Sequence, residues 1–354
     1  MIRTQTTGLT NAPTNGTGVA TGAELLTVDD LHVTFQVRGG ELRAVDGVSF
    51  ELRKGRTLGI VGESGSGKSV TARAIMGLLP PIKSRLSGSV RLGDNELVGL
   101  TEHQWRQYRG TAISLVFQDP MRSLNPTLRI GLQITESLRS HRGLGKKEAR
   151  DVAIDLLSKV RMPSPKQRFY EYPHQLSGGM RQRVMIAIAI ACHPQLLIAD
   201  EPTTALDVTT QAQVMDLLMD LQSEFQMGLI FISHDIGLAA DYTDEIAVMY
   251  AGRIVEQGST RELLDHARMP YTQALLEAIP RLDAPSHLPL PALSGRPPDP
   301  IALPAGCSFN PRCIFVQDRC RSEAPVLAGD AQHRWSCWYP LGEEPRREGA
   351  GSVR

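Results

Sequence analysis

Residues 62–69, GESGSGKS, constrain the fold of this 354-residue chain more than any other stretch. They directly follow the apolar run 57–61, which is typical of a buried parallel strand. Glycines let the backbone bring its N–H groups close to a polyphosphate, and a helix that begins near Lys68 would direct its positive dipole end at the same anion. The sequence therefore predicts a phosphate-binding loop between a strand and a helix.

The residue types in this loop suit a nucleoside triphosphate. Lys68 would neutralise the β- and γ-phosphates, and the Ser69 hydroxyl would ligate Mg²⁺. A glycine-rich turn without a ligand is the alternative, but the complete spacing between strand and helix favours the nucleotide site. The other phosphate contacts are expected from Gly62, Ser64, Gly65, Ser66 and Gly67.

Charge and hydropathy argue against a strongly basic nucleic-acid-binding protein and against a membrane-spanning chain. Lys plus Arg and Asp plus Glu both number 38, so no global basic field indicates nucleic-acid binding. The longest unbroken apolar stretch, 184–192, is far shorter than the ~20 residues that span a bilayer, and the N-terminus lacks a signal pattern. We expect a cytosolic chain unless a partner holds it at a membrane.

Four polar side chains lie at the ends of apolar runs that are typical of buried strands: Gln118, Asp200, Glu201 and His234. Ligands bind outside the carboxyl ends of parallel strands, so these side chains should face the phosphate loop across one crevice. Asp200 would orient Mg²⁺ through water, and Glu201 would deprotonate the attacking water. Gln118 would contact Mg²⁺ or that water, and His234 the γ-phosphate or Glu201. The alternatives are a solvated carboxylate pair and a structural histidine.

The sequence also predicts structure on either side of this crevice. Segments 31–35 and 45–52 flank a glycine turn, as antiparallel strands do. Phe35 is the aromatic residue best placed to stack on a purine, with an ordinary core role as the alternative. After residue 119 the apolar spacing becomes helical, and residues 149–160 form one apolar face. We expect a helical insertion there.

A second anion-binding helix start is expected at residues 177–179, where Ser-Gly-Gly precedes an apolar helix. One chain does not need two phosphate cradles for one nucleotide, so a head-to-tail dimer is the simplest arrangement. The order of the phosphate loop, Gln118, residues 176–180, Asp200–Glu201 and His234 resembles that of ABC-type ATPases. The resemblance implies that ATP lies between the phosphate loop of one subunit and four residues of the other: Ser177, Gly178, Gly179 and Asp207.

Further motifs resemble the ATPase subunits of oligopeptide/dipeptide importers: VFQDP at 116–120, YPH at 172–174, PYT at 270–272 and GCSFNPRC at 306–313. This resemblance implies ATP and Mg²⁺ as ligands and no nucleic acid. The implied partners are two membrane-spanning permease subunits, a second, paralogous ATPase and, indirectly, an extracytoplasmic substrate-binding protein. It places the chain peripherally on the cytoplasmic face of the cell membrane. Alternatives are an importer ATPase for nickel or glycopeptide, or a soluble ABC ATPase acting on nucleic acid.

The fold class implied is α/β, with a mixed or parallel sheet core, an antiparallel β subdomain, an inserted helical subdomain and a small C-terminal region containing cysteines. The expected ATPase domain covers residues 24–281, with the helical insertion at about 119–180. Seven prolines between 285 and 304 predict a stiff linker at 282–304, followed by a four-cysteine region at 305–342. Flexible tails are expected at 1–23 and 343–354.

The four C-terminal cysteines are Cys307, Cys313, Cys320 and Cys337. In a chain otherwise typical of a cytosolic nucleotide enzyme, metal ligation is favoured over disulfides. Their spacing does not match the short pairs of common zinc fingers, and four thiolates suit either an iron–sulfur cluster or zinc. The importer resemblance implies a [4Fe-4S] cluster, with Zn²⁺ and reduced packing thiols as alternatives.

Overall fold

The computed structural model describes residues 23–204, 206–279, 293–330 and 332–342. The predicted tails, apart from residue 23, lie outside these ranges, as do residues 282–292 of the predicted linker and Ala205. Within the ranges described, no helix is both long and apolar enough to cross a bilayer.

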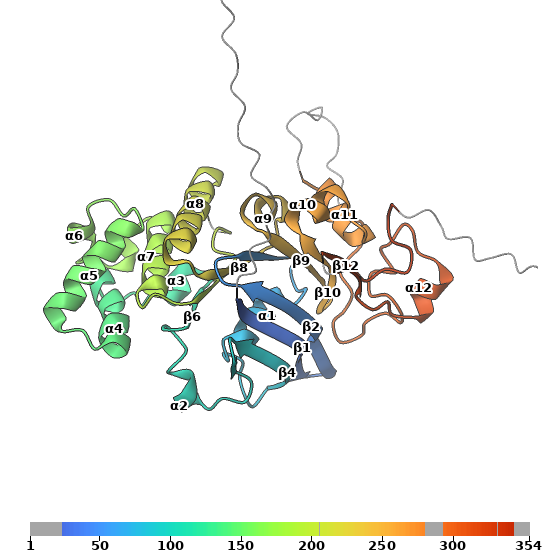
Figure 1. Cartoon of the computed structure of the whole chain (residues 1–354), viewed down its shortest axis with the longest axis horizontal. Helices are drawn as coiled ribbons and strands as arrows, with labels where there is room; N and C mark the ends of the chain where they lie inside the picture. Colours follow the sequence, from blue (N-terminus) through green and yellow to red (C-terminus); the bar gives the residue numbers. More distant parts are fainter. Residues whose placement is uncertain (1–22, 205, 280–292, 331, 343–354) are drawn as a thin grey trace, which may run out of the picture.

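An antiparallel sheet in the order β2-β1-β4-β5 forms one layer (Figure 1). The pairing of β1 with β2 confirms the antiparallel strands predicted upstream of the phosphate loop. Apolar side chains of this sheet share a core with β3 and α1. The strands are β1 (Glu24–Val37), β2 (Gly40–Arg53), β4 (Ser84–Leu92) and β5 (Asn95–Glu96), and α1 spans Lys68–Ile75.

A second sheet has the order β11-β12-β10-β9-β3-β8-β7-β6. Its parallel strands are β6 (Ile113–Val116), β7 (Leu196–Asp200), β8 (Gly228–Ser233), β3 (Thr57–Val61) and β9 (Glu245–Tyr250). Every residue of β3, β7 and β8 is buried, as expected for continuous apolar runs in a parallel sheet. Their carboxyl ends therefore meet at one edge.

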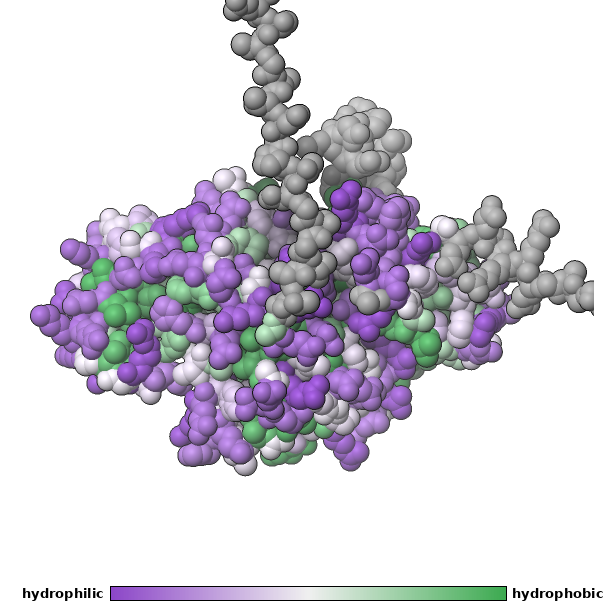
Figure 2. Space-filling model, in the orientation of Figure 1, coloured by the Kyte–Doolittle hydropathy of each residue, from purple (hydrophilic) through white to green (hydrophobic). Residues whose placement is uncertain are grey.

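The helical insertion lies beyond the β6 edge of this sheet (Figure 1). Its apolar faces pack around α7, which has almost no polar face. Figure 2 shows hydrophobic areas among the polar side chains over this part of the surface. Its helices are α3 (Pro120–Ser123), α4 (Ile130–Arg142), α5 (Lys146–Lys159), α6 (Pro165–Arg168), η1 (Pro173–Gln175) and α7 (Gly178–Ile190).

The C-terminal region extends the main sheet. β10 (Arg253–Ser259) pairs antiparallel with β9, and β12 (His333–Trp335) adds to the other edge of β10, followed by β11 (Ala328–Gly329). The α/β class with an antiparallel subdomain and a helical insertion is confirmed. The remaining helices are α2 (Glu102–Trp105), α8 (Val208–Phe225), α9 (Ile236–Tyr242), α10 (Thr260–Asp265), α11 (Pro270–Glu277) and α12 (Asp318–Ser322).

Candidate active site

The phosphate loop joins β3 to α1. Gly62 has φ 151° and Gly67 has φ 107°, values that side chains with a Cβ rarely adopt. A Cβ on Gly62 would lie 2.2 Å from the carbonyl oxygen of Met249, and one on Gly67 would lie 2.4 Å from that of Ala44. Since Gly67 offers no capping side chain, the first N–H groups of α1 remain available to an anion.

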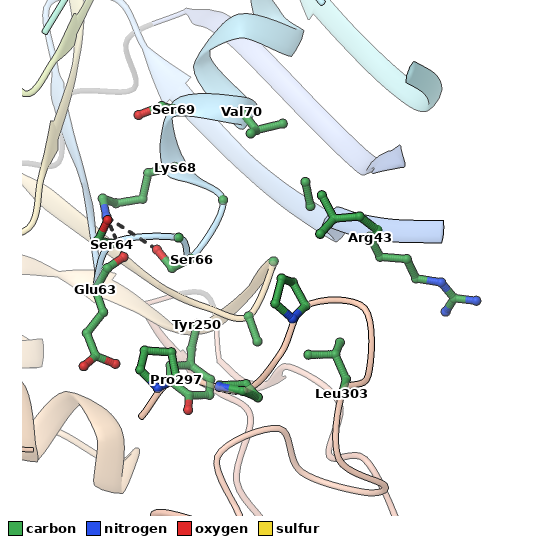
Figure 3. Close-up of a pocket in the computed structure, with 18 of the residues that line it drawn as sticks. Arg43, Glu63, Ser64, Ser66, Lys68, Ser69, Val70, Tyr250, Pro297 and Leu303 are labelled. Atoms are coloured by element: carbon green, nitrogen blue, oxygen red, sulfur yellow. Dashed lines mark hydrogen bonds between the residues drawn. The ribbon is translucent and has the colours of Figure 1, made fainter. Parts of the chain in front are cut away.

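The Lys68 side chain is buried and folds back over the loop (Figure 3). Its Nζ donates hydrogen bonds to the carbonyl oxygens of Gly62 and Glu63, at 2.7 and 2.9 Å. Burial lowers the pKa of Lys68, although the carboxylates of Glu201 and Asp200 oppose that shift. A phosphate group would bring further negative charge to this ammonium and favour its charged form.

A cavity of about 380 Å³ opens beside the loop, within the range of small-molecule sites. Leu42, Arg43 and Ala44 of β2 and the turn at 250–252 form part of its wall. The C-terminal segment forms another part, and Figure 3 places Pro297 and Leu303 across the cavity from Ser69. Sequence reasoning did not assign this segment to the site.

Phe35, predicted to stack on a purine, does not line this cavity. It lies on β1 opposite Leu42 and Ser84, and it packs against the core of the antiparallel sheet. Leu42 of the neighbouring strand reaches the cavity instead.

The residues predicted at the strand ends lie together. Gln118 Nε2 donates to Glu201 Oε2 at 2.9 Å, and His234 Nδ1 lies 3.5 Å from the same oxygen. Thr204 Oγ1 also donates to Glu201 Oε2, at 2.8 Å. The sequence analysis did not identify Thr204. Its position three residues after Glu201 is the only signal that could have indicated it. Hydrogen bonds from Gln118 and Thr204 thus orient the Glu201 carboxylate, and His234 lies beside it.

Ser69 and Asp200 form the other polar pair of the site. Ser69 Oγ donates to Asp200 Oδ1 at 2.8 Å. Asp200 is buried, and burial raises the pKa of its carboxyl group. A hydroxyl and a carboxylate beside a phosphate cradle are the oxygen donors that Mg²⁺ prefers, so these residues fit that ion.

The predicted trans contacts lie at two helix starts. Ser177 caps α7, and its Oγ accepts a hydrogen bond from the Met180 N–H at 3.3 Å. Asp207 caps α8 by accepting from the Thr210 N–H at 3.0 Å. Ser177, Gly178 and Asp207 are exposed, and none of the four predicted trans residues lines the cavity of its own chain. They are accessible to another molecule.

The predicted iron–sulfur or zinc site at the four cysteines is wrong. Within the described residues, which include all four, no group of three or more Cys, His, Asp or Glu is placed to hold a metal ion. The cysteines border one cavity of about 10 Å³, too small for a cluster. Burial raises the pKa of the Cys337 thiol to about 12 and also raises those of Cys307 and Cys313. A raised pKa favours the neutral thiol over the thiolate that ligates metals.

The fifth cysteine, Cys192, is partly buried against the main core. Its Sγ donates to the carbonyl oxygen of Ser137 at 3.7 Å. Burial raises its thiol pKa, which disfavours the reactive thiolate.

Comparison with known proteins relates this site to a family. The ABC transporter family profile matches residues 45–204, and the profile described as "Oligopeptide/dipeptide transporter, C-terminal region" matches residues 255–320. The oligopeptide transport ATP-binding protein of Salmonella typhimurium is 47% identical over 90% of this chain and 95% of that protein. The dipeptide transport ATP-binding protein of Escherichia coli is 48% identical over 91% of this chain and 98% of that protein.

Solved structures agree with this relationship. A dimeric ATP-binding cassette in a post-hydrolysis state, bound to ADP and Pi, superposes with a TM-score of 0.60 and 28% identity. The match covers 67% of this chain and 99% of that one. ATP and Mg²⁺ are therefore the ligands of the phosphate loop. The chain belongs to the ABC transporter family, as an ATPase of its oligopeptide/dipeptide branch.

Proposed function

We propose that this protein is the ATP-hydrolysing subunit that energises the import of peptides through a membrane permease. One observation carries the proposal: this chain combines two features. The Glu201 carboxylate is held by hydrogen bonds from Gln118 and Thr204, and the chain also has the C-terminal region of oligopeptide/dipeptide transporters. Relatives at 47% and 48% identity that are named for oligopeptide and dipeptide transport support peptides as the solute.

The site residues divide the work of hydrolysis. Lys68 and the loop N–H groups would hold the phosphates, while Ser69 and Asp200 would hold Mg²⁺, directly or through water. When bound, this ion would supply charge neutralisation at the β- and γ-phosphates. Glu201 takes a proton from the attacking water as the water oxygen bonds to the γ-phosphorus and the bond to the ADP oxygen breaks.

Gln118 and His234 complete this group. Both lie close to Oε2 of the Glu201 carboxylate. We assign Gln118 to the attacking water or Mg²⁺ and His234 to the γ-phosphate. Phe35 keeps its proposed purine contact only if nucleotide binding moves it toward the cavity.

A second ATPase subunit completes each nucleotide site. Ser177, Gly178 and Gly179 would approach the γ-phosphate bound to the partner, with Asp207 lining the contact, and the exposure of Ser177, Gly178 and Asp207 supports this role. We expect the partner to be a paralogous ATPase, so that ATP closes a heterodimer and hydrolysis reopens it.

The helical insertion would transmit this closure to two permease subunits. Met121, Leu132 and Tyr170 expose 61%, 51% and 44% of their surface on it, which suits contact with a protein partner. The protein would sit peripherally on the cytoplasmic face of the membrane, and an extracytoplasmic binding protein would deliver the solute. Residues 24–281 would act as the ATPase domain, with 282–304 as linker and 305–342 as C-terminal region.

Peptide uptake into proteoliposomes tests this proposal. The vesicles would contain the permease pair, the paralogous ATPase and this protein, with the binding protein and labelled peptide outside. Glu201→Gln should slow ATP hydrolysis by about 10²–10⁴-fold and stop uptake while ATP still binds. Glu224→Gln, which changes an exposed carboxylate paired with Lys159, is the matched control.

Three outcomes would contradict parts of the proposal. Uptake that Glu201→Gln leaves unchanged would overturn the role of this ATPase. Uptake of nickel or a glycopeptide in place of peptides would overturn the solute. Salt-sensitive nucleic-acid binding without uptake would favour a different class of ABC protein.

A further inference from the structure

Arg312 of the C-terminal region contacts the phosphate loop directly. Its guanidinium forms two hydrogen bonds with the Glu63 carboxylate, Nη1 to Oε2 at 2.5 Å and Nη2 to Oε1 at 2.9 Å. The Arg312 side chain is only 3% exposed and that of Glu63 is 25% exposed. This is a bidentate salt bridge, a strong type of charge-assisted contact, between residues 249 positions apart.

Glu63 is held at its main chain as well. Its N–H donates to the Tyr271 hydroxyl at 2.9 Å, and its carbonyl oxygen accepts from Lys68 Nζ at 2.9 Å. Every polar group of Glu63 thus has a partner. The second residue of the phosphate loop is fixed from α11 and from the C-terminal region at once.

Aromatic side chains support the guanidinium. Arg312 lies 5.9 Å from the ring centres of both Tyr250 and Phe309, and these rings pack on Tyr271. The hydrogen bonds that Arg312 donates to the Glu63 carboxylate raise the pKa of Arg312, so the cation keeps its charge. Since Tyr250 itself lines the nucleotide cavity, this group is continuous with the site.

Arg312 also holds the opposite wall of the cavity. Its Nε donates to the carbonyl oxygen of Ser294 at 2.9 Å. Three residues further along the chain, Pro297 begins the part of this segment that lines the cavity, and Leu303 ends it (Figure 3). One guanidinium therefore joins the phosphate loop to the C-terminal wall.

Charge gives this link a second role. Glu63 lies within the loop that cradles the phosphates and lines the same cavity. An unpaired carboxylate there would repel a polyphosphate, because like charges in a partly desolvated site are poorly screened. Arg312 neutralises that charge.

We propose that Arg312 is a positioning residue of the ATP site, which neutralises Glu63 and holds the C-terminal segment against the bound nucleotide. The C-terminal region is then part of the nucleotide site as well as an extension of the sheet. The inference rests on ATP binding at the phosphate loop.

A double-mutant cycle tests it, with full-length protein titrated with a non-hydrolysable ATP analogue and Mg²⁺. Arg312→Gln should weaken binding on the order of tenfold, because most of the loss comes from the carboxylate left unpaired. Glu63→Gln with Arg312→Gln should recover most of the affinity, since no unpaired charge remains. The affinity of Arg312→Lys should lie between those of wild type and Arg312→Gln, because lysine keeps the positive charge but cannot form the paired contact.

Thermal unfolding of each variant separates this role from a loss of folding. Equal affinity for wild type and Arg312→Gln would overturn the inference, as would additive losses in the double variant. Lys68→Ala, which removes the ammonium group of the phosphate loop, is the reference variant for loss of binding to the ATP analogue. Failure of wild type to bind the analogue would count against the proposed ATPase function instead.

Discussion

At the scale of single residues, Glu201 has a constrained backbone. Its φ is +46°, in the left-handed region that side chains with a Cβ enter at a cost of about 1–3 kcal/mol. Its N–H donates to the Ile232 carbonyl oxygen at 3.0 Å, which ties this conformation to β8. The conformation places the carboxylate between Gln118 and Thr204.

Thr204→Val should lower kcat for ATP hydrolysis on the order of tenfold with KM nearly unchanged. Valine keeps the shape but removes the hydroxyl that donates to Glu201 Oε2, and a hydrogen bond to a charged group contributes about 1.5–3 kcal/mol. Steady-state kinetics measures both constants. Thr204→Ser, which retains the donor, should stay near wild type, and an equal loss in both variants would refute this role.

Some of the site can be predicted from sequence at this scale. Gln118, Glu201 and His234 each follow a recognisable apolar run, and parallel strands bring such ends together. Arg312 and Glu63 follow no local pattern. Their contact forms because the tertiary fold brings Arg312 back to the phosphate loop, 249 positions after Glu63. The spacing of residues in the sequence does not predict this contact.

At the scale of elements, the helical insertion depends on the close packing of Gly131 in α4 against the Phe169 ring. Gly131 lies in the first turn of α4, and a Cβ there would lie 2.4 Å from ring carbons of Phe169. The N–H of Gly131 also donates to the Phe169 carbonyl oxygen at 2.9 Å. The absence of a side chain lets α4 begin directly against the end of α6.

Gly131→Ala should therefore destabilise the insertion by about 1–3 kcal/mol, the usual cost of overpacking a core. Thermal unfolding and limited proteolysis between residues 120 and 175 would measure it. Gly145→Ala is the matched control, because nothing lies within 4 Å of a Cβ there and its φ is −64°. A melting temperature unchanged by Gly131→Ala would contradict the packing argument.

Predictability also differs among elements. Continuous apolar runs made β3, β7 and β8 recognisable, because full burial leaves no polar positions. β11 and β12 are two and three residues long, with His333 and Arg334 in β12, so no alternation marks them. Pairing with β10 makes them strands.

At the scale of the whole molecule, Asp46 joins the two sheets. From β2 its Oδ2 accepts hydrogen bonds from Arg253 Nε and Nη2 at the start of β10, at 2.9 and 2.6 Å. His32 Nδ1 lies 3.2 Å from the other oxygen. Burial alone would raise the pKa of Asp46, but Arg253 and His32 outweigh it and hold the pKa below 3.8.

Asp46→Asn should lower the free energy of unfolding by about 1 kcal/mol at pH 7, a modest value because water screens the half-exposed Arg253. A carboxyl group with a lowered pKa stabilises the folded state above its unfolded pKa, and that stability disappears as pH falls through the folded pKa. Chemical denaturation at several pH values should show a constant difference down to about pH 5 and a shrinking one below 3.8. A difference that grows on acidification would contradict this sign.

The addition of β12 to the sheet has a consequence for shortened versions of the protein. β12 covers the outer edge of β10, and His333 Nε2 lies 2.7 Å from Oε1 of the fully buried Glu256. A polypeptide ending before residue 333 would uncover a row of unpaired backbone groups and leave an interior carboxylate short of a partner. Such a product would recruit strands from other molecules, so aggregation would be the expected fate of a truncated ATPase.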